Sequence, residues 1–204
     1  MTGTSVSRTE GPGRWLAKVA TEVLSPYTVL IAMPFVVGAA TQERQAEALW
    51  WAAALAVFSS FIPWVLIMGG ALRGRWEGHH VRNREGRRTP LIICGSSVIA
   101  VTVLMAVFDA PSSMQALGVA ELVLLAVTVG VTFGFKWKIS IHAAVASAAA
   151  LVTAVLYGLA WHWLWLLVLL VGWSRVRVND HDLPQVIGGT LLGLVGGALF
   201  VGIA

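Results

Sequence analysis

Two histidines in this sequence have neighbours suited to chemistry on a phosphate group. His142 follows Lys138 and Ser140, and His181 lies six residues after Arg175. The guanidinium group of an arginine binds phosphate oxygens through bidentate hydrogen bonds, and a lysine adds a point charge. One imidazole can attack phosphorus while a second imidazole protonates the oxygen that leaves. These residue types predict metal-free phosphoryl transfer through a phosphohistidine.

A third basic segment holds six arginines within 16 residues, from Arg73 to Arg88. Three of them, Arg84, Arg87 and Arg88, have the spacing of one helix face. With Arg82, they are candidates for holding the non-bridging oxygens of a phosphate as charge develops on them. The same positive charge would also orient a protein in a membrane, so this simpler explanation of the run stays open.

The elements that must position these residues are transmembrane helices. The chain has 204 residues, of which 57% are hydrophobic and only 12% are charged. Soluble domains carry about twice that share of charge, so the composition excludes a soluble globule, a disordered chain and a disulfide scaffold. Long stretches with few or no charges predict spans at residues 23–42, 48–72, 89–108, about 115–135, 139–174 and 183–204. We expect an all-α polytopic membrane bundle of about six to seven transmembrane helices.

The stretch from Ile139 to Ser174 has 36 residues without a formal charge. As one helix it would extend about 54 Å, nearly twice the thickness of the hydrocarbon core. Gly158 and the residues Trp161, His162 and Trp163 near its middle predict an interfacial turn between two short helices, which brings the count to seven spans. Residues 1–22 are expected to form a cytoplasmic N-terminal segment, and residues 23–204 a single transmembrane domain.

Positive charge is distributed unevenly between the two sides that seven spans define. The side with the N-terminus holds 13 of the 14 lysines and arginines, and the other side holds only Arg44. The positive-inside rule therefore predicts a cytoplasmic N-terminus in the cell (plasma) membrane, with both candidate histidines on that side. Glu121, near the start of its span, is expected to lie where lipid headgroups hydrate it.

Two of these segments resemble motifs of the type 2 phosphatidic acid phosphatase superfamily, which includes lipid phosphatases and vanadium haloperoxidases. The third motif of that family reads Ser-Arg, five residues, His, three residues and Asp, and residues 174–185 keep all of it except the last position, which is Gln185. The second motif reads Pro-Ser-Gly-His, of which Ser140 and His142 remain. The resemblance covers roughly residues 80–204 and implies the helical membrane fold of that family.

The first motif of the family, Lys, six residues and Arg-Pro, is the weakest match. Aligned on Pro90, Arg82 stands in the lysine position and Thr89 in the arginine position. Arg87 or Arg88 would then take the role of the missing arginine.

The resemblance implies a role for each matching residue. His181 would attack phosphorus, and His142 would protonate the leaving oxygen and then activate water. Gln185 would orient the nucleophile through its amide oxygen but without the charge of the family's aspartate, unless Asp180 or Asp182 compensates. The residues implied to bind phosphate are Arg175, Lys138, Ser140, Arg82, Arg84, Arg87 and Arg88. Neither a metal nor another cofactor is implied.

The leading hypothesis is an integral membrane phosphatase that hydrolyses a lipid phosphate or a prenyl phosphate or diphosphate. One alternative is a terpene cyclase or prenyltransferase that ionises prenyl diphosphates with Mg²⁺, which needs paired carboxylates. Residues 179–182 superficially resemble such an acidic motif, but their spacing is wrong for it. The non-enzymatic alternative is a protein that binds or transports anionic lipids. Membrane lipids are the expected surroundings, no nucleic-acid module is visible, and the oligomeric state stays open, a homo-oligomer included.

Overall fold

A computed structural model of the protein describes residues 12–42, 44–73 and 88–204. Within these ranges the chain is helical and contains no strand, which confirms the predicted all-α class. The helices are α1 (Pro12–Val23), α2 (Pro26–Ala40), α3 (Gln45–Ala56), η1 (Val57–Phe61), α4 (Ile62–Leu72), α5 (Arg88–Val107), α6 (Ser112–Val129), η3 (Gly130–Gly134), α7 (Ile141–Tyr157), η4 (Leu159–Trp163), α8 (Leu164–Arg177) and α9 (Leu183–Ile203).

Five helical stretches are long and apolar enough to cross a membrane. They are Gln45–Leu72, Thr89–Val107, Ser112–Gly134, Leu159–Arg177 and Leu183–Ile203. Helices α1 and α2 make a sixth if they are taken as one span, and α7 is a shorter apolar helix of 17 residues. Large apolar side chains also face outward, among them Ile92, Leu169 and Val195, each more than 60% exposed. Such surfaces are those of a membrane protein.

Helices α1 and α2 meet at a bend of 43°. Ser25 has an extended backbone and caps α2, because its side-chain oxygen accepts a hydrogen bond from the N–H of Thr28. Pro26 then occupies the first turn of α2, where its missing N–H is not needed. The hydroxyl of Thr21 donates to that of Ser174, so the end of α1 is attached to α8. The described part of the N-terminal segment is therefore a helix that packs on the bundle.

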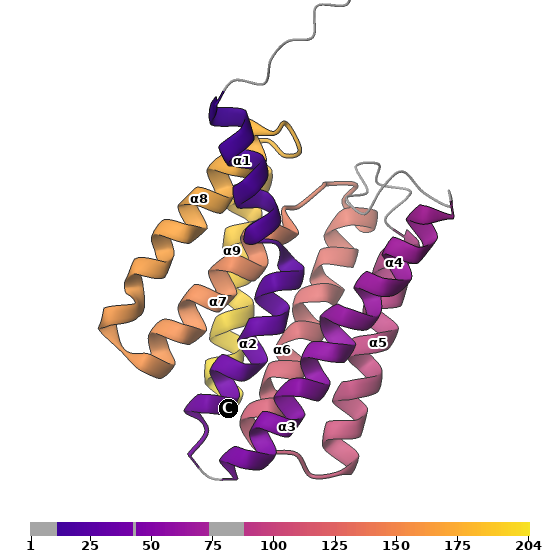
Figure 1. The fold of residues 1–204 in the computed structure, drawn as a ribbon, viewed down its shortest axis with the longest axis vertical. Coiled ribbons are helices and arrows are strands. Elements are labelled where there is room, and N and C mark those ends of the chain that lie inside the picture. Colours follow the sequence, from indigo (N-terminus) through magenta and orange to yellow (C-terminus); the bar gives the residue numbers. More distant parts are fainter. Residues whose placement is uncertain (1–11, 43, 74–87) are drawn as a thin grey trace, which may run out of the picture.

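The predicted turn between two short helices is confirmed. Helix α7 ends at Tyr157, and Gly158 follows with φ +89°, a backbone conformation that L side chains rarely adopt. The 3₁₀ turn η4 then leads into α8. Consequently α7 and α8 run in opposite directions and both lie beside α9, as Figure 1 shows.

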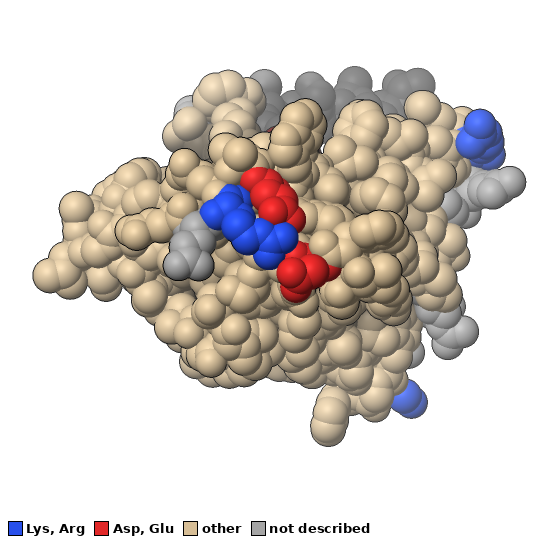
Figure 2. Space-filling view, turned by 90° about the horizontal axis from the view of Figure 1, so that it is seen from below, with Lys and Arg blue, Asp and Glu red and all other residues tan. Residues whose placement is uncertain are grey.

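The direction of the helices places the described connections at two ends of the bundle. Figure 1 shows the connection from η3 to α7 and that from α8 to α9 at the upper end, and the C-terminus at the lower end. At the lower end, Arg44 forms an ion pair with Glu47 (2.6 Å) and lies 3.5 Å from the carboxylate of Asp109. Figure 2, seen from below, shows these charged side chains as a small group on a face with little other charge.

Helices α7 and α9 approach each other closely through glycines. A Cβ at Gly189 would overlap the carbonyl oxygen of Ser140, and a Cβ at Gly193 would overlap the carbonyl oxygen of Ala144. Small residues of this kind let the backbones of membrane helices come into contact. The backbone N–H of Ser140 also donates to the carbonyl of Gln185 (3.1 Å), which links the start of α7 to the first turn of α9.

The first prediction concerns this contact. Replacing Gly193 with alanine should lower the stability of the purified protein by about 1–3 kcal/mol, because a backbone atom of α7 cannot move aside without separating the helices. Gly202, on the same helix with open space around its Cβ position, provides the matched control. Thermal unfolding in detergent, followed by tryptophan fluorescence, measures both variants, and equal transition temperatures would contradict the prediction.

Candidate active site

The candidate site lies at the upper end of the bundle, where α7 begins, α8 ends and α9 begins. Lys138, His142, Arg175, Asp180 and His181 line one cavity at this end. Both histidines and the arginine are less than 10% exposed. Segments about 40 residues apart in the sequence are thus brought together, and the two candidate histidines face the same space.

The ring of His181 is held by two acceptors. Its Nδ1 lies 2.9 Å from the side-chain oxygen of Gln185 and 3.3 Å from the backbone carbonyl of Lys138. Because both partners are oxygens, Nδ1 carries a proton, and in the neutral imidazole Nε2 is then the nitrogen with the lone pair. This is the tautomer that a histidine needs to act as a nucleophile through Nε2.

The amide of Gln185 is in turn oriented by Asp182. The amide nitrogen of the side chain donates to one carboxylate oxygen of Asp182 (3.2 Å), and the backbone N–H of Gln185 donates to the other (2.9 Å). A carboxylate only accepts hydrogen bonds, so the amide NH₂ faces Asp182 and the amide oxygen faces the imidazole. Asp182 also caps α9 and therefore belongs to the helix that carries Gln185. The carboxylate of Asp182 therefore places a negative charge near His181, but the side chain of Gln185 lies between the two.

Asp180 organises the connection between α8 and α9. Its carboxylate accepts a hydrogen bond of 2.7 Å from Arg175, and its backbone carbonyl accepts one of 2.8 Å from the ammonium group of Lys138. Its own N–H donates to the carbonyl of Arg175 (3.1 Å), and Asn179 has the left-handed conformation, with φ 59°. The side chains of the ion pair are only 5% and 10% exposed. Part of the hydrogen-bonding capacity of Arg175 is thus committed within the protein.

Ser140 has a structural position. Its hydroxyl accepts a hydrogen bond from the N–H of Ala143 (3.4 Å) and so caps α7. The side chain is fully buried and is not among those that line the cavity. Its hydroxyl therefore positions the helix that carries His142 instead of facing the cavity.

The basic segment before α5 is described only at its end. Arg82, Arg84 and Arg87 lie outside the described residues, and the structure describes Arg88 only as the first residue of α5. Pro90 lines the cavity, so the start of α5 lies beside it.

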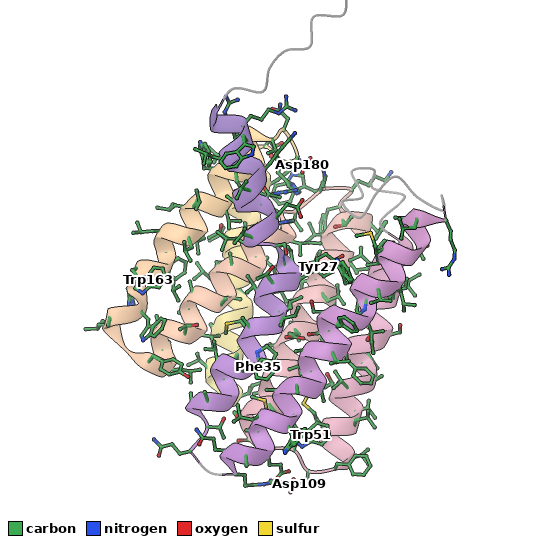
Figure 3. All side chains as sticks on the ribbon, viewed as in Figure 1. Tyr27, Phe35, Trp51, Asp109, Trp163 and Asp180 are labelled. Atoms are coloured by element: carbon green, nitrogen blue, oxygen red, sulfur yellow. The ribbon has the colours of Figure 1, made fainter. Side chains whose placement is uncertain are left out.

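Below the polar side chains, the cavity continues into the apolar interior of the bundle. Its volume is about 250 Å³, and its deeper part is lined mainly by aliphatic side chains and by Gly196, Gly197 and Phe200 of α9. Figure 3 shows Asp180 at the upper end of the bundle and Tyr27, which also lines the cavity, farther down. A polar end joined to an apolar interior fits an amphiphile whose charged group stays near the histidines.

The expectation that lipid headgroups hydrate Glu121 is wrong. Helix α6 already begins at Ser112, so Glu121 lies near the middle of the span Ser112–Gly134. Both of its carboxylate oxygens are buried, and the side chain lines the apolar part of the cavity. The apolar stretch at about 115–135 placed the start of the helix three residues too late, and the sequence contained no information on the direction in which the side chain of Glu121 points.

Two residues near His181 have structural roles that the motif comparison did not assign. Asp180 pairs with Arg175, and Asp182 both caps α9 and orients Gln185. The sequence did contain a signal for the cap, since Asp182 precedes Leu183 and Pro184 in the way that helix starts prefer. The pairing of Asp180 has no such local signal, because it depends on the turn that follows α8.

No family model matches the chain, and no curated protein and no solved structure matches it either. Within the described ranges, no group of three or more His, Cys, Asp and Glu side chains is arranged to hold a metal ion.

The second prediction separates the buried ion pair from an exposed one. Replacing Asp180 with asparagine should cost about 3 kcal/mol of unfolding free energy, because the charge of Arg175 would lose its buried partner. The same change at Asp109, whose side chain is 91% exposed beside Arg44, should cost less than about 1 kcal/mol. Denaturant titration in detergent gives both values. Equal losses would show that the Arg175–Asp180 pair does not hold the turn.

Proposed function

We propose that this protein is an integral membrane phosphatase of the type 2 phosphatidic acid phosphatase superfamily, acting on a lipid phosphate or a prenyl phosphate or diphosphate. One observation carries the proposal. His142 and His181 line the same cavity, and the Nδ1 of His181 is held by the side-chain oxygen of Gln185. This arrangement supports a nucleophilic histidine opposite a histidine that transfers protons.

In the first step, Nε2 of His181 attacks phosphorus, and the bond between phosphorus and the lipid oxygen breaks. His142, in its protonated form, donates a proton to that oxygen, so the product leaves as a neutral alcohol. For a diphosphate substrate the leaving group is a monophosphate instead. The imidazole of His181 gains positive charge as it is phosphorylated, and its Nδ1 proton remains hydrogen-bonded to Gln185.

In the second step, a water molecule attacks the phosphohistidine. His142, now neutral, accepts a proton from the water, the bond between nitrogen and phosphorus breaks, and inorganic phosphate forms. The protonation states of both histidines return to those at the start, so the cycle is complete without a metal.

Lys138 and Arg175 are the described cations at the cavity. In the proposed reaction they stabilise the negative oxygens that surround phosphorus in the transition state. Arg175 does so while paired with Asp180, so the described part of the site is held in place before any substrate binds. Arg82, Arg84, Arg87 and Arg88 add to this charge in the proposal.

The apolar continuation of the cavity supports a substrate with a hydrocarbon chain. The distribution of lysine and arginine favours a site that opens on the cytoplasmic side of the plasma membrane. Substrates made on that side include isoprenyl diphosphates, phosphatidylglycerol phosphate, phosphatidic acid and phosphorylated polyprenyl sugars.

The third prediction tests the nucleophile. His181→Ala should lower phosphate release from a panel of lipid phosphates by at least 100-fold, because the variant lacks the proposed nucleophile. The detergent-purified protein is assayed with EDTA, which should not inhibit it, and with vanadate, which should. Acid-labile radioactive phosphate should be trapped on the unaltered protein and not on the variant.

His162→Ala is the matched control, since His162 lies in η4 between α7 and α8, is not among the residues that line the cavity, and has its Nδ1 in contact with the carbonyl of Leu159. That variant should keep full activity. Full phosphate release by His181→Ala would contradict the proposal, and so would complete dependence on Mg²⁺.

The fourth prediction concerns the amide beside the nucleophile. Gln185→Asp should raise the rate constant of phosphoenzyme formation roughly 10-fold and shift the pH dependence of that rate constant. The reason is that a carboxylate stabilises the positive charge on the imidazole of His181, whereas an amide only orients the ring. Gln185→Leu should lower the rate, because Nδ1 of His181 would lose its closest acceptor. Rapid-quench measurements over a range of pH give the rate constants of both variants. Unchanged rates in both variants would show that the contact has no role in catalysis.

A further inference from the structure

Glu121 places a carboxyl group in the apolar part of the cavity. Its side chain lines the cavity together with Ser59, which lies in the helical turn η1. Both carboxylate oxygens of Glu121 and the hydroxyl of Ser59 are buried, and this hydroxyl is close enough to interact with the carboxyl group. No other described residue forms a hydrogen bond with these atoms. No other acidic side chain lines the deeper part of the described cavity, since Asp180 belongs to the polar cluster at its upper end.

The packing of α9 gives the depth of Glu121 relative to the histidines. Gly193 lies against Ala144, two residues after His142, while Gly196 lies against Leu124, three residues after Glu121. Gly196 lies three residues below Gly193 on α9. Because α7 runs downward and α6 upward, His142 lies two residues above Ala144 and Glu121 lies three residues below Leu124. These offsets add to a separation of roughly 12 Å along the bundle at 1.5 Å per residue. Glu121 is therefore far too deep to contact a phosphate held by His142 and His181.

Burying a carboxyl group whose hydrogen-bonding capacity is not filled raises the free energy of the folded protein. Burying a polar group without a hydrogen bond costs roughly 1–3 kcal/mol by protein measurements, and an ionised one costs more. Ionisable side chains inside membrane spans usually face an internal cavity and mark the path or the site of a ligand. Glu121 fits this description, because it faces a cavity and because, apart from the hydroxyl of Ser59, no described group bonds its two carboxylate oxygens.

We propose that Glu121 is a specificity-determining residue that accepts a hydrogen bond from a hydroxyl or amide N–H group on the substrate chain. The proposal rests on the proposed function for placing the phosphate at the histidines. An extended chain advances about 1.2 Å per bond, so the donor lies roughly ten bonds from phosphorus. The preferred substrate is thus a lipid phosphate with a polar group along its chain, and not a plain prenyl phosphate.

The experiment compares dodecyl phosphate with the same ester hydroxylated at its eighth carbon, where the hydroxyl oxygen is ten bonds from phosphorus. The unaltered protein should hydrolyse the hydroxylated ester with a kcat/KM roughly 10-fold higher, because its hydroxyl finds an acceptor in the apolar cavity. Glu121→Leu should reverse this preference, since the hydroxyl would then be buried without a partner. Glu121→Gln, which retains an acceptor oxygen, should keep it.

Thr132→Val is the matched control. Thr132 follows Glu121 on the same span, and its hydroxyl is buried without a partner among the described residues, but it is not among the residues that line the cavity. This variant should retain the preference of the unaltered protein. Loss of the preference in Thr132→Val would indicate a general effect of repacking and would overturn the assignment.

A binding measurement separates this proposal from the proposed function. The phosphonate analogues of the two esters cannot be hydrolysed, and calorimetry in detergent gives their dissociation constants. A Glu121-dependent preference in binding without turnover would support the assignment and contradict the phosphatase. Turnover without any preference between the two esters would contradict the assignment of Glu121 but not the proposed phosphatase activity. If neither binding nor turnover discriminates between the two chains, Glu121 is not a ligand contact.

Discussion

The close contact between α7 and α9 is the constraint on which the geometry of the candidate site depends. Gly189 and Gly193 leave no room for side chains, so the carbonyl oxygens of Ser140 and Ala144 lie directly against α9. The hydrogen bond from the N–H of Ser140 to the carbonyl of Gln185 then fixes how far the two helices are shifted along each other. His142 follows this junction by two residues. Its place relative to the segment that carries His181 is therefore set by backbone contacts between the two helices.

Hydrogen bonds within the connection between α8 and α9 organise the charged part of the site before any substrate binds. Arg175 and Lys138 both bond to Asp180, one through its carboxylate and the other through its backbone carbonyl. A buried ion pair gains little net stability, because both groups lose their hydration. What the pair does supply is a defined turn, and that turn presents the imidazole of His181 to Gln185. In the proposed reaction, substrate binding would therefore require little reorganisation of these described residues, as catalysis by preorganised charge demands.

Local patterns in the sequence were sufficient for the helices and for part of the site. Apolar runs with few or no charges predicted four of the spans to within three residues at each end, and the glycine at 158 predicted the turn that separates α7 from α8. Properties that depend on how helices pack were not predictable in this way. The depth and direction of Glu121 follow from the register of α6 against α9, and the pairing of Asp180 follows from a turn with one left-handed residue, Asn179. The roles assigned to the arginines of residues 82–88 stay predictions, because most of that segment lies outside the described residues.

Helix α9 contributes to the site in two ways that use the same residue type. Toward its start, Gly189 and Gly193 bring the helix against α7 and so locate the histidines, while one turn farther on Gly196 and Gly197 line the cavity. Larger residues at the first pair would separate the two histidine-bearing segments, whereas a Cβ at Gly196 would press on Leu124 of α6 and one at Gly197 on Leu151 of α7. The first pair therefore sets the position of the two histidines, and the second pair sets how closely α6 and α7 approach α9 at the wall of the cavity. In the proposed function, a glycine-rich final helix therefore links the position of the two histidines to the width of the cavity that would hold the substrate chain.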